Sequence, residues 1–365
     1  MKKYLLFVST DFGGGVSRII RELGKNLQKY FNLKIFVTDY GNKPKHYEEL
    51  YKNLPISRFR SISIARAYSI SFSFLRALIK EKPDIIHGHH YGYFPLTCAF
   101  IAAKINKIPF VASTYLHPPS KSLFLKALFY LYHYTQGKWI LKGANAIIVS
   151  TKMEKEIIES YGINGKKIFV IPNPIDTKRF APLDKHRSKN KKIVLFVGPL
   201  NHNKGADIFF DIAKKLAGQR SDVAFVLIGR GELDAKFRDE AKQYGNKIKI
   251  INYVEDDELI KMYSLADLFV LPTHYESFGM GLVEAMACGT PVISARVGAV
   301  PEIVPEDSGF LFDYGKWSGM EKKINYLLDN PDALKKIGAK ARDFVLKNFD
   351  ISKVAEKLRQ VYDSL

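Results

Sequence analysis

Two glutamates close to the start of one expected helix could hold the hydroxyl groups of a ligand. Glu276 lies in a loop after an apolar strand, and Glu284 follows in the helix that begins near Gly279 and Gly281. Carboxylates accept hydrogen bonds from hydroxyls, and the N–H groups at a helix N-terminus bind anions such as a diphosphate. Because ligands bind at the carboxyl ends of strands in open parallel sheets, we expect this loop to face a ligand. The alternative is a pair of solvated surface glutamates.

Three consecutive glycines, Gly13–Gly15, follow the first expected strand. Glycine lets backbone N–H groups come close to an anion, and the helix that follows offers its positive N-terminus. The spacing is not that of a dinucleotide-binding motif, because Arg18 stands where the third glycine would be. A tight turn without a ligand is the alternative.

Histidines at two positions could contact a substrate. His117 lies in a loop after a strand and precedes two prolines. Its imidazole can donate or accept a hydrogen bond near neutral pH, although a plain loop histidine is the alternative. His89 belongs to a cluster with His87 and His90. That cluster lacks an obvious fourth ligand or a cysteine, so we expect no zinc site.

These residues are positioned by an alternation of strands and helices. The expected strands are Tyr4–Ser9, Leu33–Asp39, Ile85–His87, Phe110–Ser113, Ala146–Ser150, Ile193–Gly198, Ala224–Gly229, Ile248–Ile251, Leu268–Leu271 and Pro291–Ser294. Helical stretches such as Val16–Tyr30, Asp207–Ala217 and Gly281–Ala287 separate them. This alternation predicts an α/β protein with parallel sheets covered by helices. Two such series predict two Rossmann-like, doubly wound domains that face each other across a cleft.

A length of 365 residues fits two domains. We expect a first domain at 1–183, a second at 184–350, and a terminal helix at 351–365 that packs back toward the first domain. The two cysteines cannot form a disulfide framework, and no stretch of about 18 residues is apolar throughout. The first apolar run is too short for a signal peptide. We therefore expect a cytoplasmic protein without a transmembrane helix.

The positive charge is concentrated in the first half of the chain. Residues 1–185 hold 29 basic and 12 acidic side chains, and residues 186–365 hold 27 and 25. This asymmetry indicates that the first half meets an anionic surface, either a membrane or a nucleic acid. Aromatic and basic residues alternate at 58–82 and 121–142, as in helices that lie on membranes. No nucleic-acid-binding module is recognisable, so the alternative to a membrane is an ordinary solvated surface.

The run from Pro272 to Pro291 resembles the Glu-x7-Glu signature of family 4 glycosyltransferases (glycosyl transferases group 1), which are retaining enzymes of the GT-B fold. Other segments resemble this family in the same order along nearly the whole chain. They are Gly13–Gly15, Asp84–His89, Ile171–Asp176, Val197–Gly205, Ile228–Gly231, Tyr253–Val254 and Ser308–Phe312. The resemblance implies that a hexose moves from a nucleotide sugar to a hydroxyl acceptor by front-face substitution, without a metal or cofactor. The implied donor is GDP-mannose, or a UDP-sugar carrying glucose or N-acetylglucosamine.

The resemblance also implies residue roles. Lys204 would neutralise the donor diphosphate, Glu276 would hold hydroxyls of the donor sugar, and Glu284 would hold the ribose. His117 would contact the donor sugar, and His89 the acceptor or the sugar. The further donor contacts implied are Gly14, Gly15, Arg230, Tyr253, Val254, Phe278, Gly279 and Met280. Pro199 stands where the family often has arginine, so Arg230 or a basic group of the first domain would have to supply that charge.

The acceptor is the least defined partner. Lipid-modifying members of the family dock on membranes through the first domain, so a basic first half fits a lipid or lipid-linked acceptor and a peripheral place on the inner membrane face. Two other interpretations use the same fold: a non-catalytic sugar-binding scaffold and a nucleotide-sugar epimerase. The complete set of Lys204, Glu276 and Glu284 argues against the scaffold.

Overall fold

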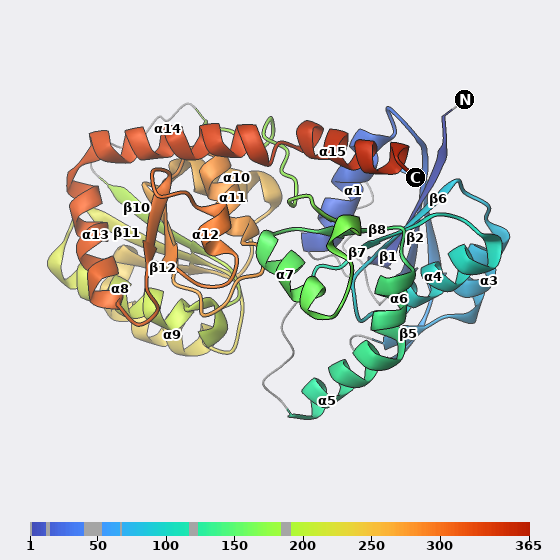
Figure 1. Ribbon diagram of the computed structural model, residues 1–365. Coiled ribbons are helices and arrows are strands. Elements are labelled where there is room, and N and C mark those ends of the chain that lie inside the picture. The colour runs from blue at the N-terminus through green and yellow to red at the C-terminus, as the bar shows by residue number, and fades with distance from the viewer. Residues whose placement is uncertain (1, 12–14, 40–52, 66–67, 117–122, 184–190) are drawn as a thin grey trace. The chain divides into compact units, whose positions relative to one another are not determined.

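A computed structural model of the chain describes residues 2–11, 15–39, 53–65, 68–116, 123–183 and 191–365 (Figure 1). The chain forms two compact units. Unit 1 comprises Met1–Pro174 together with Ile351–Leu365, and unit 2 comprises Ile175–Asp350. Each unit is a parallel sheet covered by helices.

Unit 1 is built on a seven-stranded parallel sheet with the order β3-β2-β1-β6-β7-β8-β9. Its strands are β1 (Tyr4–Asp11), β2 (Asn32–Asp39), β3 (Ile56–Arg60), β6 (Ile85–His89), β7 (Phe110–Ser113), β8 (Ala146–Val149) and β9 (Ile168–Val170). A small antiparallel pair is formed by β4 (Ile62–Ala65) and β5 (Tyr68–Ile70). The helices are α1 (Gly15–Leu27), α3 (Phe72–Lys80), α4 (Phe94–Asn106), α5 (Leu123–Tyr132), α6 (Lys138–Gly143), α7 (Lys152–Ser160) and α15 (Ile351–Asp363).

Unit 2 has a six-stranded parallel sheet with the order β12-β11-β10-β13-β14-β15. Its strands are β10 (Lys192–Val197), β11 (Val223–Ile228), β12 (Ile248–Ile251), β13 (Leu268–Leu271), β14 (Val292–Ala295) and β15 (Gly309–Phe312). The helices are α8 (Ala206–Gln219), α9 (Asp234–Ala241), α10 (Asp256–Leu265), α11 (Met280–Ala287), α12 (Val300–Ile303), α13 (Trp317–Asp329) and α14 (Pro331–Asn348). A short 3-10 turn, η3 (His202–Lys204), follows β10.

The expected strands are confirmed, to within two residues at their ends. The units divide between Pro174 and Ile175 rather than after residue 183. The reason is that the intervening segment packs on unit 2. Ile175 forms a parallel bridge with Asp350, the Thr177 hydroxyl donates to the carboxylate of Asp350, and Phe180 is buried in the core of unit 2.

The terminal helix α15 belongs to unit 1. Its apolar stripe of Val354, Leu358 and Val361 is buried. At its end the buried Tyr362 hydroxyl is hydrogen-bonded to His87 Nδ1 at 2.6 Å, and His87 Nε2 is bonded to Ser113 Oγ at 2.8 Å. A polar chain thus joins α15 to the ends of β6 and β7.

Buried histidines make unit 1 sensitive to acid. Burial lowers the pKa of His87 to about 3, and burial together with His87 lowers the pKa of His89 well below its usual value. The unfolded chain takes up these protons near pH 6.5, whereas folded His87 does not until about pH 3 and folded His89 stays neutral well below pH 6.5. Stability therefore falls as the pH drops below about 6.5, by about 1.4 kcal/mol per pH unit for His87, and His89 adds to the loss in the same direction. We expect a clearly lower melting temperature at pH 5 than at pH 7.5, and equal values would contradict this.

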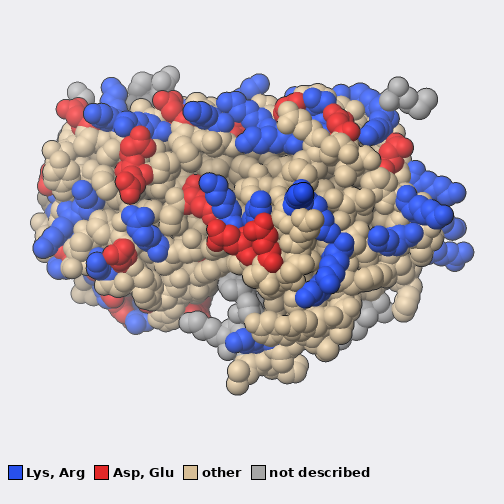
Figure 2. All heavy atoms as spheres, in the orientation of Figure 1, with Lys and Arg blue, Asp and Glu red and all other residues tan. Residues whose placement is uncertain are grey.

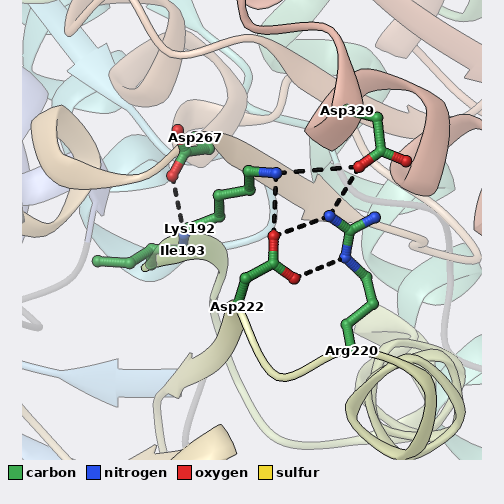
Figure 3. A network of polar contacts seen from close by, with 6 residues as sticks. All are labelled: Lys192, Ile193, Arg220, Asp222, Asp267 and Asp329. Carbon is green, nitrogen blue, oxygen red and sulfur yellow. Dashed lines mark hydrogen bonds and ion pairs between the residues drawn. The ribbon is translucent and has the colours of Figure 1, made fainter. Parts of the chain in front are cut away.

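A network of charged side chains ties together the amino-terminal edge of the unit 2 sheet (Figure 3). Arg220 Nη2 lies 2.9 Å from Asp222 Oδ2 and 2.7 Å from Asp329 Oδ1, and Lys192 Nζ lies 3.0 Å from Asp222 Oδ2. The Arg220 guanidinium holds the pKa of both Asp222 and Asp329 below the usual range. Their contribution to stability is therefore present above about pH 4 and is lost only as the pH falls further.

Candidate active site

Lys204 and Glu276 come from two different loops of unit 2, and the structure brings them into contact. Lys204 Nζ lies 2.6 Å from Glu276 Oε2. The lysine side chain is 25% exposed and the glutamate side chain 12%, so a ligand can reach the pair from solvent. The two loops follow β10 and β13, which are neighbours in the sheet, while β10 pairs with β11 on its other side. The strand order therefore reverses here, and open parallel sheets bind ligands at such a point.

Backbone contacts fix the two loops against each other. The carbonyl of Asn203 accepts hydrogen bonds from the His274 N–H at 2.9 Å and from the Thr273 hydroxyl at 3.1 Å. The side chain of Asn201 caps the η3 turn by accepting from the Lys204 N–H at 3.0 Å. Lys204 is thus held on a short turn whose position is set by the Glu276 loop.

Two glycines allow this close approach. Gly298 has φ +53°, and a Cβ there would overlap the carbonyl oxygen of Glu276, which accepts from the Ala299 N–H at 2.9 Å. Gly205 has φ +68°, and a Cβ there would overlap the carbonyl oxygen of Pro272. Neither glycine has an assigned role in the sequence motifs; the signal was their position immediately after turns that follow β10 and β14.

Glu284 lies on α11 and is buried, with its Oε2 accepting a hydrogen bond from the Tyr263 hydroxyl at 2.9 Å. The helix begins at Met280, after Gly279 with φ +97°. The N–H groups of its first turn have no acceptor within the helix and point toward the loop side. The ring of Phe278 packs in the core at 5.7 Å from Phe349, so any donor contact by Phe278 would have to come from its backbone.

The other unit 2 candidates lie at the same carboxyl edge of the sheet. Arg230 follows β11 and is exposed, and its carbonyl accepts from the Leu200 N–H at 2.9 Å. Arg230 is thereby placed beside the loop that carries Pro199. Tyr253 and Val254 follow β12, the tyrosine exposed and the valine half-buried.

The candidate residues of unit 1 are only partly covered by the structure, and one of them is buried. Gly15 is the exposed first residue of α1, whereas Gly14 and His117 lie outside the described residues. His89 is fully buried at the end of β6, with its ring stacked on His87 at 4.1 Å. Neither ring nitrogen of His89 has a hydrogen-bond partner within the described part of the chain.

A small cavity lies behind the carboxyl edge of the unit 1 sheet. It is lined by His87, Ser113, Tyr115, Ser150 and Asn173, among others, and measures about 20 Å³. That is room for about one water molecule, so it cannot enclose a sugar. The described residues contain no group of three or more His, Cys, Asp or Glu side chains arranged to hold a metal ion.

Two family models cover most of the chain. The model "Glycosyltransferase Family 4" matches residues 13–179, and the model "Glycosyl transferases group 1" matches residues 178–344. The chain belongs to the group 1 and family 4 glycosyltransferases. This glycosyltransferase has the expected GT-B class of fold, with two Rossmann-like units.

Individual relatives agree with this assignment. An uncharacterized glycosyltransferase of Methanocaldococcus jannaschii is 28% identical over 100% of this chain and 99% of its own length. The phosphatidylinositol N-acetylglucosaminyltransferase gpi3 subunit of Schizosaccharomyces pombe is 26% identical over 68% of this chain and 54% of its own. The crystal structure of Anabaena HepE in complex with UDP and glucose superposes with a TM-score of 0.78, at 19% identity and over 100% of both chains. Within the residues that the structure describes, every helix is too short or too polar to cross a lipid bilayer.

Proposed function

We propose that this glycosyltransferase moves a hexose from a nucleoside diphosphate sugar to a hydroxyl acceptor, with retention of configuration. The observation that carries the proposal is the contact between Lys204 and Glu276 at the point where the strand order reverses. An ammonium group at this place can neutralise the charge that grows on a leaving diphosphate, and the carboxylate can hold sugar hydroxyls. Glu284 would then hold the ribose. The HepE complex with UDP and glucose supports a UDP-sugar, and GDP-mannose is the other donor that we propose.

In the mechanism that we propose, the configuration at the anomeric carbon is retained without a nucleophile from the protein. The bond between the anomeric carbon and the diphosphate oxygen breaks, and the bond to the acceptor oxygen forms on the same face of the sugar. The acceptor proton passes to the departing diphosphate. Glu276 forms an ion pair with Lys204 and would position the sugar. The protein therefore contributes orientation of the substrates and stabilisation of charge. We propose that neither a metal nor a cofactor takes part.

Arg230 is our candidate for the positive charge that Pro199 lacks. The hydrogen bond from the Leu200 N–H to the Arg230 carbonyl places the two segments side by side. The arginine is exposed, and no ion pair binds its guanidinium within the described residues. A guanidinium at this position could bind a phosphate with two hydrogen bonds.

Thermal-shift measurements with GDP-, UDP- and ADP-sugars test the proposal. A donor that binds only the folded protein stabilises it by about 2.7 kcal/mol at a concentration of 100 times its dissociation constant. We expect one class of donor to raise the melting temperature and to release its nucleotide on incubation. Failure of every nucleotide sugar in both measurements would refute the proposed function.

We further propose that unit 1 docks on an anionic membrane that carries a lipid or lipid-linked acceptor. Helix α5 is apolar on nearly all sides, which is typical of a buried helix, yet Leu123, Phe124 and Leu131 are 82%, 76% and 61% exposed. The surface over α5 is almost entirely uncharged in Figure 2. Unit 1 holds 29 basic and 12 acidic side chains. An exposed apolar helix on a basic unit fits a peripheral protein at the inner face of a membrane.

Replacing Phe124 and Leu131 together by glutamate should release the protein from vesicles of phosphatidylglycerol. Burying each of these side chains in the interface is worth about 1.5–3 kcal/mol, so binding should weaken by roughly 10²-fold or more. Co-sedimentation with vesicles measures this. The control replaces Ile105 and Tyr326, which are exposed apolar residues outside α5, by glutamate. Equal sedimentation of both double variants would reject α5 as the docking helix.

A further inference from the structure

Tyr115 adopts a strained backbone conformation at the carboxyl end of the unit 1 sheet. It follows β7 closely and has φ +45°, in the left-handed region that bulky residues avoid. Its half-buried ring lies 6.1 Å from the ring of His89 and 5.7 Å from that of His90. Such strain persists only where surrounding structure holds it, and it is concentrated at functional sites.

A single buried carboxylate holds Tyr115 from both sides. Glu154 Oε1 accepts hydrogen bonds from the Thr114 hydroxyl and from the Leu116 N–H, both at 2.6 Å. These are the residues immediately before and after Tyr115. Glu154 Oε2 accepts from the N–H and hydroxyl of Ser150 at 2.7 and 2.9 Å. The carboxylate therefore joins the loop after β7 to the loop after β8.

Helix capping alone does not account for this glutamate. Thr151 and Glu154 have the spacing of a capping box, in which the glutamate bonds back to the N–H of the capping residue. The Thr151 side chain does cap α7, accepting from the Glu154 N–H at 3.1 Å. The carboxylate of Glu154, however, turns to the two loops and is buried there. Burying a charge is costly, and here four hydrogen bonds and the N-terminus of α7 offset the cost.

We propose that Glu154 is a positioning residue for glycosyl transfer, which fixes Tyr115 at the carboxyl edge of the unit 1 sheet for contact with the acceptor. This inference rests on the proposed function. Tyr115 lies at the carboxyl edge of the unit 1 sheet, the edge at which open parallel sheets bind ligands, whereas the proposed donor residues Lys204 and Glu276 belong to unit 2. Glu154 acts through the backbone of residues 114–116 and does not itself touch the substrate. Its loss should therefore slow transfer without weakening the binding of the donor.

The test compares Glu154→Gln with Glu156→Gln. Glutamine keeps the size of the side chain, but its amide group would point N–H donors at N–H and hydroxyl donors. Glu156 is exposed on the same helix, so its variant loses the same charge without touching the loops. We measure nucleotide release from the donor that the thermal-shift screen selects, at a temperature where circular dichroism shows both variants folded. Glu154→Gln should lower kcat by about 10²-fold, as expected for a misplaced contact, and leave KM within about twofold.

Three further variants test the positioning role of Glu154 if Glu154→Gln does not fold. Thr114→Val removes one of the four donors to the carboxylate and should lower kcat in the same direction. Tyr115→Ala and Tyr115→Gly both remove the ring, but glycine also removes the backbone strain. The glycine variant should melt about 2–4 °C above the alanine variant, while both lose turnover. Normal turnover in Thr114→Val and Tyr115→Gly would overturn the inference.

The outcomes separate this inference from the proposed function. If no nucleotide sugar stabilises the unaltered protein and none is hydrolysed, the proposed function fails. If the unaltered protein is active and Glu154→Gln matches Glu156→Gln in kcat, only the positioning role of Glu154 fails.

Discussion

Lys204→Ala is expected to lower nucleotide release by roughly 10²–10³-fold, the loss typical of one group that stabilises charge in the transition state. Lys204 Nζ is the cation that lies 2.6 Å from Glu276, at the place where the leaving diphosphate is expected. Its removal leaves Glu276 without a partner and the diphosphate without neutralisation. The measurement is kcat/KM for the donor that the thermal-shift screen selects.

Lys215→Ala is the matched control for this variant. Lys215 lies on α8, the helix that follows η3, and also forms an ion pair, with Glu321 at 2.8 Å, but it is exposed and lies eleven residues after Lys204. Exposed ion pairs contribute about 0–1 kcal/mol, so both variants should fold and only Lys204→Ala should lose activity. Full activity of Lys204→Ala would show that Lys204 does not stabilise the leaving diphosphate.

Gly298→Ala is expected to disturb the site without altering any charged or polar side chain. The new Cβ would overlap the Glu276 carbonyl, and the residue would keep a left-handed conformation at φ +53°. The backbone strain costs roughly 1–2 kcal/mol, and the overlap roughly another 1–3 kcal/mol. Because the segment that must yield carries Glu276, turnover should fall along with the free energy of unfolding.

Gly315→Ala separates these two costs. Gly315 has φ +88°, and a Cβ at that position would have no atom within 4 Å. Its variant should therefore lose only the backbone cost, melt between the unaltered protein and Gly298→Ala, and retain its activity. The same melting temperature and the same turnover for both variants would show that the contact with Glu276 has no importance.

The central strands that the sequence alone predicts correctly are apolar runs. The central strands β1, β10, β11 and β13 are continuous apolar runs because both faces of a parallel sheet are covered. Helix α4 is not among the helices named from the sequence, since it is apolar on nearly all sides and has no amphipathic period to detect. The edge strands β3, β9 and β15 were missed because they are short and partly exposed.

For the site, residue types and spacing were sufficient to place Glu276 and Glu284 after β13, because a loop after a buried strand and a glycine at a helix start are local features. The same holds for the family assignment, which rests on short segments in a fixed order. The contact of Lys204 with Glu276 could not be derived in this way. It exists because β10 and β13 are neighbours, and the order of strands in a sheet depends on long-range packing.

The amino-acid sequence by itself thus determined the class of fold, the family and the loops that carry the proposed donor residues, since each depends on local patterns of apolar, glycine and charged residues. Tertiary structure decided which groups meet. Glu154 has the spacing of a helix cap, yet its carboxylate holds Thr114 and Leu116. His87 and Tyr362 are hydrogen-bonded although they lie 275 positions apart in the sequence. Such pairings follow from burial. A polar group removed from water costs free energy unless it forms a hydrogen bond, and its partner is a group that the fold places nearby.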